Sequence, residues 1–328
     1  MISILISTYN YDCYRLVCDL RGQCEACGID YEIIVGDDCS RDKLSQIACM
    51  KVNEFPRCRY SPSADNLGLA ATRNRLAEES GGDYLLFLDS DAMVCTDDFI
   101  LVYLDNCSKA DVIVGGIRTP DMRRDELVSR CETADLGKPH SMFVVNRTLR
   151  YKYEKNADLR RDAATRNAAP YQSLSCFNIM IRRDVFFDVR FDEQCRQYGY
   201  EDVIFGGELE QRGISILHID NPLLHMGIDT NEQFLKKTET AIRTLVDIEP
   251  DTYVRSRLRQ WSYRLATAHV KGITTVLVKC LKPMLRRNLL STHPCLFMFS
   301  LYKLGYFLCL EQEKTVTLHA ENEEIDNK

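Results

Sequence analysis

The feature that most constrains the fold is the alternation of short apolar segments with helical segments in the first third of the chain. The apolar segments are continuous, and "YLLFL" at 84–88 is the clearest of them. Continuous apolar runs of this length are typical of parallel strands that are buried on both faces. Strands are therefore expected at Ile2–Ser7, Tyr31–Gly36, Arg57–Tyr60 and Tyr84–Leu88, and helices at Cys13–Cys27, Lys43–Val52 and Leu67–Glu79. This order predicts an α/β fold, with a mostly parallel sheet between layers of helices.

Polar residues follow three of the expected strands. Taken singly, each is compatible with an ordinary turn or helix cap. In parallel sheets, however, ligands gather at the carboxyl ends of the strands, so three polar strand ends at one edge predict a binding site. The residues are Ser7, Thr8, Tyr9 and Asn10 after the first strand, Asp37 and Asp38 after the second, and Asp89, Ser90 and Asp91 after the fourth.

The chemistry of this edge favours a divalent cation. A dinucleotide site would need GxGxxG after the first strand, but "LISTYNYDCY" contains no glycine, and a Walker-type phosphate loop is also absent. Buried carboxylates need positive compensation. Hard cations such as Mg²⁺ or Mn²⁺ take oxygen ligands from one or two carboxylates together with substrate phosphates. We therefore expect Asp89 and Asp91 to hold such an ion.

Six segments, in a fixed order, carry a resemblance to a known family. They are "ILISTYN", "YEIIVGDDCSRD", "DNLGLAATRN", "YLLFLDSDA", "SCFNIMIRRDVFFDVRFDE" and "YGYEDVIFGGELEQRG". The series resembles the family 2 glycosyltransferases, which use nucleotide sugars and have the GT-A fold, and it covers residues 2–227. The chain departs from the family pattern at Ser7, where many members have Pro, and at Cys39, where Gly is common. Tyrosines flank Gly199 where relatives often have Trp, which leaves the acceptor and sugar preference open.

The resemblance implies roles in donor binding. Asp38 stands at the position that binds the imide of uracil, and Tyr9 would stack on the uracil ring or only line a wall. Arg73 would approach the diphosphate or pair with a neighbouring acid, and a solvated helix arginine is the alternative. Further donor contacts are implied for Ser7, Thr8, Asn10, Asn66, Gly68, Asp89 and Ser90.

The resemblance also implies a metal site and a catalytic pair. Asp91 would ligate the metal directly, Asp89 would contact the metal or the ribose, and His225 would add a ligand or simply be a packed histidine. Asp202, near the start of a helix, is the expected general base, with an ordinary N-terminal acid as the alternative. Glu201 would bind hydroxyls of a sugar. Inversion at the anomeric carbon is implied by the family.

These expectations combine into one function and one alternative. The chain is expected to be an enzyme, a metal-dependent inverting hexosyl- or N-acetylhexosaminyltransferase. It would move a sugar from a nucleoside diphosphate, expected to be UDP, to a glycan or lipid-linked acceptor in polysaccharide or surface glycan synthesis. A non-catalytic nucleotide-sugar-binding or scaffold protein of the same fold is the alternative, although Asp38, Asp91 and Asp202 are all intact.

The expected domain organisation has three parts. Residues 1–250 form the GT-A domain, with a nucleotide-binding half at 1–115 and an acceptor half at 116–250. Within the second half, 121–175 is expected to be an irregular acceptor loop or a solvated excursion. Residues 251–310 form a basic and apolar helical appendage, and 311–328 form an acidic, disordered tail.

The basic segment has two open interpretations. From Thr252 to Leu310 there are ten Lys or Arg and no Asp or Glu, in a chain whose net charge is −6. Its apolar runs are too short to span a membrane, so it would lie on an anionic membrane surface or pack on the catalytic domain or a second subunit. Nucleic acid binding is disfavoured, because no recognition motif is present. The fifteen cysteines without a leader sequence predict reduced thiols and a cytoplasmic location, with attachment to the inner face of the membrane left open.

Overall fold

The computed structural model describes residues 1–133, 141–193, 199–248 and 256–326. The chain divides into two compact units. The sheet unit comprises Met1–Pro120, Glu154–Arg196 and Tyr200–Gly227, and the helical unit comprises Asp121–Tyr153, Gln197–Gly199 and Ile228–Lys328.

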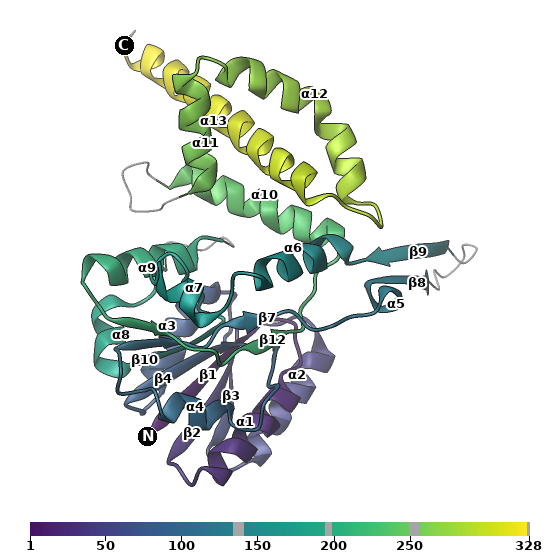
Figure 1. Ribbon diagram of the computed structural model, residues 1–328. Coiled ribbons are helices and arrows are strands. Elements are labelled where there is room, and N and C mark those ends of the chain that lie inside the picture. The colour runs from purple at the N-terminus through teal and green to yellow at the C-terminus, as the bar shows by residue number, and fades with distance from the viewer. Residues whose placement is uncertain (134–140, 194–198, 249–255, 327–328) are drawn as a thin grey trace. The chain divides into compact units, whose positions relative to one another are not determined.

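A seven-stranded sheet forms the centre of the sheet unit (Figure 1). Its strand order is β11-β6-β10-β4-β1-β2-β3. Neighbouring strands run parallel except at β10, which is antiparallel to both β4 and β6. The strands are β1 (Ile2–Thr8), β2 (Tyr31–Asp37), β3 (Cys58–Pro62), β4 (Tyr84–Asp89), β6 (Val112–Val114), β10 (Asn178–Arg182) and β11 (Ile216–His218). The predicted α/β class with a mostly parallel sheet is confirmed.

The helices of this unit pack on the two faces of the sheet. Successive side chains of β1 point to opposite faces, so Ile4 and Ile6 belong to one buried apolar cluster while Leu5 belongs to the other. Burial on both faces explains why the strands are continuously apolar. The helices are α1 (Tyr14–Ala26), α2 (Lys43–Met50), the 3₁₀ helix η1 (Lys51–Glu54), α3 (Leu69–Glu79), α4 (Phe99–Leu104), α7 (Ala163–Asn167), α8 (Arg183–Val189) and α9 (Glu201–Gln211).

A second, three-stranded sheet lies in the same unit, with the order β5-β12-β7. Its strands are β5 (Ala92–Met93), β7 (Ile117–Arg118) and β12 (Leu223–His225). Because β5 directly follows Asp91 and pairs with β12, it brings the segment after β4 next to His225. No expected strand anticipated this pairing, since two-residue strands leave no sequence pattern.

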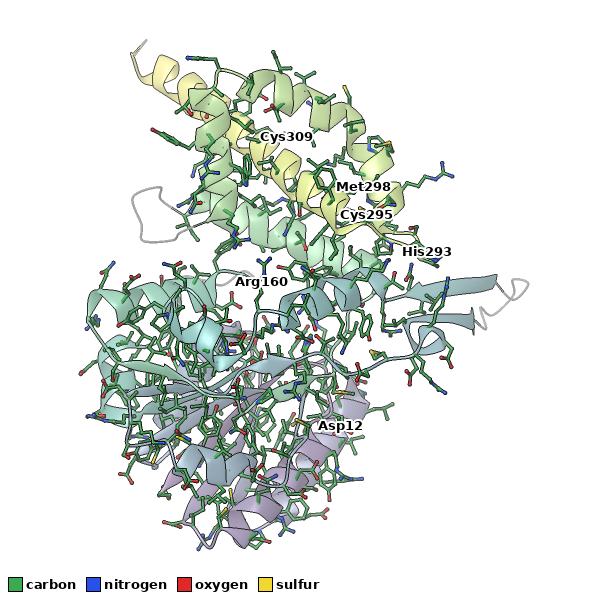
Figure 2. All side chains as sticks on the ribbon, viewed as in Figure 1. Asp12, Arg160, His293, Cys295, Met298 and Cys309 are labelled. Carbon is green, nitrogen blue, oxygen red and sulfur yellow. The ribbon has the colours of Figure 1, made fainter. Side chains whose placement is uncertain are left out.

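The helical unit has its own core. It contains α10 (Asn231–Asp247), α11 (Arg257–Thr267), α12 (Lys271–Leu289) and α13 (Leu296–Asp326), and Figure 1 shows α13 between α10 and α12. Phe234 of α10 packs with Leu285 of α12 and with Phe299 and Tyr302 of α13. Figure 2 labels Met298 and Cys309 on α13, whose side chains lie among the helices of this unit.

The structure corrects three expectations about organisation. The segment 121–175 is not irregular, because it holds α5 (Arg124–Leu127), the hairpin of β8 (Val128–Thr133) and β9 (Ser141–Asn146), α6 (Thr148–Asp158) and α7. The boundary expected at residue 250 lies outside the described residues, and α10 already belongs to the helical unit because its apolar face is buried in that unit's core. Residues 311–326 continue α13 as helix, consistent with their content of good helix formers. Among the described helices, none is long and apolar enough to cross a membrane.

Candidate active site

The expected polar residues meet at the carboxyl end of the central sheet. The register pairs Ser7 of β1 with Asp89 of β4, and Thr8 with Asp37 of β2. The backbone N–H of Ser90 donates to the carbonyl of Ser7 at 3.2 Å, which joins the two loops that follow. The buried Ser7 hydroxyl has no hydrogen-bond partner among the described residues. A buried hydroxyl without a partner is available to form a hydrogen bond with a bound ligand.

The loop after β1 is fixed by Asn10. Its carboxamide oxygen accepts from the backbone N–H groups of Arg41 at 2.6 Å and Asp42 at 2.9 Å. Asn10 has a φ of 53°, in the left-handed region that asparagine tolerates. Asn10 therefore joins the loops after β1 and β2. Beside it, Tyr9 is 48% exposed, so its ring is accessible to a ligand, while the hydroxyl of Thr8 donates to the carbonyl of Tyr11.

Asp38 organises the turn that leads into α3. Its two carboxylate oxygens accept from the backbone N–H groups of Leu67 at 2.6 Å and Gly68 at 3.0 Å. The side chain of Asn66 donates to the Asp38 carbonyl at 2.9 Å. Gly68 has a φ of 88°, which favours glycine. The structure thus brings together three of the residues predicted to bind the donor, and it assigns them contacts that shape the loop.

Arg73 is the central cation of the site. Its side chain is 2% exposed, and the guanidinium donates to Asp89 Oδ1 at 2.7 Å. A second guanidinium nitrogen lies 3.8 Å from Asp202 Oδ1, and the group lies over the Phe191 ring at 5.2 Å from its centroid. Of the two alternatives to a diphosphate contact, the structure excludes the solvated arginine and shows pairing with acids. Two of its nitrogens, Nε and one terminal nitrogen, have no hydrogen-bond partner among the described residues.

The electrostatics of this group follow from burial and proximity. Burial raises the pKa of Asp89 to about 6, with Asp91 and Asp202 acting in the same direction and Arg73 opposing them. Burial lowers the pKa of Arg73, but its proximity to Asp89 outweighs this, so the pKa lies above its ordinary value. Arg73 therefore remains a permanent positive charge between two acids.

Asp202 lies in the first turn of α9, directly after Glu201. The residue before this helix, Tyr200, has a φ of 71°, which is uncommon for a residue with a side chain. The helix dipole favours a negative charge at this end. The Asp202 side chain is 33% exposed, so it contacts both Arg73 and solvent. Burial raises the pKa of the neighbouring Cys176 thiol, and Asp202 adds to the effect, so the thiol stays neutral.

A second charged group lies beside Asp91. His225 Nε2 lies 3.1 Å from Asp91 Oδ2, and His225 Nδ1 lies 2.9 Å from Glu154 Oε2. The three elements involved are the segment before β5, the end of β12 and α6. Burial lowers the pKa of His225, but its hydrogen bonds with Asp91 and Glu154 outweigh burial and raise it to about 9. The structure therefore places Asp91 next to His225, the two residues that the family resemblance implies as metal ligands.

Glu154 is a site residue that the sequence analysis missed. It is 1% exposed, although it lies in the polar stretch "RYKYEKNADLRR". Because that stretch is rich in exposed charges, one buried carboxylate within it gives no local signal. The indirect clue was His225, since a histidine that binds a metal usually donates its other nitrogen to a carboxylate.

Gly227 allows the chain to pass close to Asp91. A Cβ atom at this position would lie 2.0 Å from Asp91 Oδ2. The neighbouring backbone N–H of Met226 donates to the Asp91 carbonyl at 2.8 Å. The absence of a side chain at Gly227 is thus required by the position of the Asp91 carboxylate.

Asp91 and His225 could hold a divalent cation between them, provided that the imidazole gives up its Nε2 proton to the solvent when the ion binds. Asp91 Oδ2 and His225 Nε2 face each other and would be the two ligand atoms. Glu154 contacts the other ring nitrogen and fixes the orientation of the imidazole. Within the described ranges no group of three or more His, Cys, Asp or Glu side chains is arranged to hold a metal. Two protein ligands are enough where substrate phosphates supply others. His218, which is also buried, contacts Arg166 and the carbonyl of Pro170 and so has a structural role.

Comparison with known proteins decides the family. The model of Glycosyl transferase family 2 matches residues 3–187, which is more than half of the chain. The chain belongs to this family. An uncharacterized glycosyltransferase of Haemophilus influenzae is 34% identical over 100 residues, which make up 30% of this chain and 38% of the relative. The match with that relative therefore spans little more than a third of its length.

Solved structures of S. aureus TarS are similar at a distance. TarS 1–349 is 14% identical with a TM-score of 0.45, and the likeness covers 96% of this chain and 91% of that chain. A longer TarS chain is 16% identical with a TM-score of 0.47, and the likeness covers 95% of this chain and 55% of that chain. TarS 1–349 in complex with UDP-GlcNAc is 15% identical with a TM-score of 0.43, and the likeness covers 96% of this chain and 92% of that chain. Likeness at these scores is too weak to support an inference about this chain.

Proposed function

We propose that the chain is a metal-dependent inverting glycosyltransferase that moves a sugar from a nucleoside diphosphate to an acceptor hydroxyl. Family membership supports a glycosyl transfer role. The observation that carries the proposal is the buried Arg73, which contacts both Asp89 and Asp202 at the carboxyl end of the sheet. A buried cation held between two acids is costly as a purely structural feature. It is useful where a diphosphate and a general base must be held near each other.

Asp202 is the proposed general base. The acceptor oxygen attacks C1 of the donor sugar, and the bond from C1 to the diphosphate oxygen breaks with its electron pair leaving on the diphosphate. The proton of the acceptor hydroxyl passes to Asp202. Contact with Arg73 orients the Asp202 carboxylate, and the partial exposure of its side chain leaves room for the acceptor. Attack from the face opposite the leaving group inverts the anomeric carbon.

Asp91 and His225 are the proposed ligands of Mg²⁺ or Mn²⁺, with Asp89 beside them. When bound, the ion would act as a Lewis acid that neutralises charge on the leaving diphosphate. Glu154 would hold the His225 ring through its other nitrogen. Arg73 would supply a fixed positive charge on the other side of Asp89.

The donor is proposed to be a UDP-sugar. Tyr9 offers an accessible ring for stacking on the base, and Asp38 lies buried in the adjacent loop. Asn66 and Gly68 hold that loop through backbone contacts. The Ser7 hydroxyl, which has no partner within the described part of the chain, and the buried Ser90 would complete the contacts to the ribose and phosphates.

The acceptor is proposed to be a hydroxyl of a glycan or of a lipid-linked saccharide, with Glu201 contacting sugar hydroxyls. Glu201 precedes Asp202 at the start of α9 and is half-buried. Transfer of this kind would serve polysaccharide or surface glycan synthesis. A non-catalytic nucleotide-sugar-binding protein is the second candidate, and it would bind the donor without needing Asp202.

A thermal-shift panel tests the proposal. UDP-, GDP- and dTDP-sugars are each added with and without Mn²⁺, and the sample with the largest shift names the donor. We expect a UDP-sugar to raise the unfolding temperature only in the presence of the metal. No shift with any nucleotide sugar would contradict donor binding. If a nucleotide sugar raises the unfolding temperature but no nucleotide is released when saccharide acceptors are added, the non-catalytic candidate is favoured.

A further inference from the structure

One helix of the helical unit has an apolar surface that the unit's core does not use. α12 buries one face, through Thr275, Val278, Leu285 and Leu289. The last three of these join the apolar core with residues of α13. In Figure 1 α12 lies along one side of α13, with α10 on the other. The opposite face of α12 is therefore not needed to hold the helices together.

That opposite face is also apolar. We define the α12 stripe as Ile273, Val276, Leu277, Cys280 and Met284. Their spacing places them on one side of a helix, away from the buried positions. Ile273 is 75% exposed, Val276 63%, Leu277 57% and Met284 52%, and Cys280 is also exposed. Contiguous exposed apolar residues of this kind mark an interaction surface.

Lys279 and Arg287 lie beside the stripe by helical spacing, whereas Lys282 lies on the side of the helix that faces α13. Lys279, Lys282, Arg286 and Arg287 are all exposed on the same helix. Arg286 lies 3.5 Å from a carboxylate oxygen of Glu232, and Lys282 lies over the ring of a tyrosine in α13. Among the described residues, Lys279 and Arg287 form no ion pair. The segment 252–310 itself contains no Asp or Glu, and the acids beside the α12 cations come from neighbouring helices, such as Glu232 of α10 and Glu311 of α13.

We propose that the α12 stripe and its cations dock the protein on an anionic lipid surface. An apolar face flanked by Lys and Arg suits the boundary between acyl chains and negatively charged headgroups. Trp261 and Tyr263 of α11 are 51% and 72% exposed, and both residue types are favoured at such a boundary. A second copy of the chain is a poorer occupant, because pairing the same face would bring like charges together. The inference stands independently of the proposed transferase activity.

Vesicle co-sedimentation tests the proposal. The full chain is mixed with phosphatidylcholine vesicles that contain either no phosphatidylglycerol or about 30 mol% of it. The variant Ile273→Ser/Leu277→Ser/Met284→Ser removes the stripe. Its matched control, Leu44→Ser/Ile47→Ser/Leu101→Ser, removes exposed apolar side chains from α2 and α4 of the sheet unit. We expect the wild type and the control to bind anionic vesicles equally, and the stripe variant to bind roughly tenfold or more weakly.

Two further results separate the alternatives. The variant Lys279→Gln/Arg287→Gln should reduce binding to anionic vesicles several-fold and leave the weak binding to neutral vesicles unchanged. Equal vesicle binding by the stripe variant and its control would overturn the proposal. The proposal would also be overturned if light scattering showed the wild type to be a dimer and the stripe variant a monomer. A second copy of the chain would then be the occupant of the stripe. Donor binding to the sheet unit, measured in parallel, should be the same in all of these variants.

Discussion

The sheet edge and α12 depart from the usual distribution of side chains in opposite directions. At the sheet edge Arg73, Glu154 and His225 are charged or polar yet only 2%, 1% and 6% exposed. On α12, by contrast, Ile273 is 75% exposed. Buried charge costs free energy, and exposed apolar surface gives up free energy that burial would have gained. Buried polar groups and exposed apolar patches are the informative exceptions in a fold, and we propose that the first binds the nucleotide-sugar donor and the second an anionic lipid surface.

The largest effect is expected from Asp202→Asn. Loss of the general base should lower the rate of transfer by roughly 10²–10⁴-fold while leaving donor affinity nearly unchanged. Nucleotide release with the identified donor and acceptor gives the rate, and calorimetry gives the affinity. Glu210→Gln, on the exposed side of the same helix, is the control and should retain activity. Full activity in the Asp202 variant would remove this residue from the mechanism.

Arg73→Met tests whether the buried charge at the sheet edge is paired as described. Removing one partner leaves Asp89 and Asp202 without compensation, so the free energy of unfolding should fall by about 3–5 kcal/mol. The control is Arg75→Met, two residues along α3, where the ion pair with Glu79 is partly exposed and the loss should be about 1 kcal/mol or less. Chemical denaturation measures both. Similar losses for the two arginines would contradict the special status of Arg73.

His218 extends the comparison to a buried group outside the site. Burial lowers its pKa to about 4, with Arg166 acting in the same direction. Between pH 6.5 and 4 the unfolded chain binds a proton at this residue and the folded chain does not, so stability falls as the pH falls. The loss from this residue should reach about 3 kcal/mol near pH 4.

Denaturation at several pH values measures that loss. In His218→Asn the free energy of unfolding should fall less steeply between pH 6.5 and 4, because the contribution of His218 to that fall is removed. His269→Asn, at an exposed position, is the matched control. An unchanged slope in the His218 variant would mean that the group already titrates normally.

Gly227→Ala tests the packing around Asp91. Its Cβ would lie 2.0 Å from Asp91 Oδ2, so the carboxylate must move, at a cost of about 1–3 kcal/mol. We expect metal-dependent donor binding to weaken by about tenfold, since this shift displaces a ligand. Gly22→Ala in α1 is the control, because nothing lies within 4 Å of its Cβ and alanine should stabilise a helix by roughly 0.5–1 kcal/mol. Unaltered metal dependence in the Gly227 variant would show that Asp91 is not a ligand.

The smallest effect is expected on α12 itself. Each serine substitution in the α12 stripe should change the free energy of unfolding by about 0.5 kcal/mol or less, because the side chains are exposed. Leu285→Ala, on the buried face of the same helix, should cost about 2–5 kcal/mol. Thermal or chemical unfolding distinguishes the two. A large loss from the stripe would mean that it already packs within the protein.

Much of the sheet unit could be predicted from sequence, because its strands are buried on both faces. Continuous apolar runs gave β1, β2 and β4 to within a residue or two, and the acids after them marked the edge. Ser7 and Asp89 lie near the carboxyl ends of two adjacent parallel strands, and the register pairs them directly. Local patterns therefore suffice where secondary structure and burial coincide.

The missed features depend on contacts between distant segments. Glu154 is buried only because β12 brings His225 to α6, and no pattern within "RYKYEKNADLRR" encodes that contact. For Arg73 the sequence offered pairing with a neighbouring acid as one alternative, but only the fold shows that the acids are Asp89 and Asp202. The exposed face of α12 was equally hidden, since a mixed run of apolar and basic residues does not reveal which side faces the core.

Metal-dependent donor binding is tested most directly by titrating UDP into the protein by calorimetry, with and without Mn²⁺, for the wild type and Asp91→Asn. We expect Mn²⁺ to strengthen UDP binding by roughly tenfold or more in the wild type. The variant should lose this enhancement and keep only the weak, metal-free affinity. Equal affinity with and without the metal, or full enhancement in Asp91→Asn, would contradict a divalent ion held between Asp91 and the donor diphosphate.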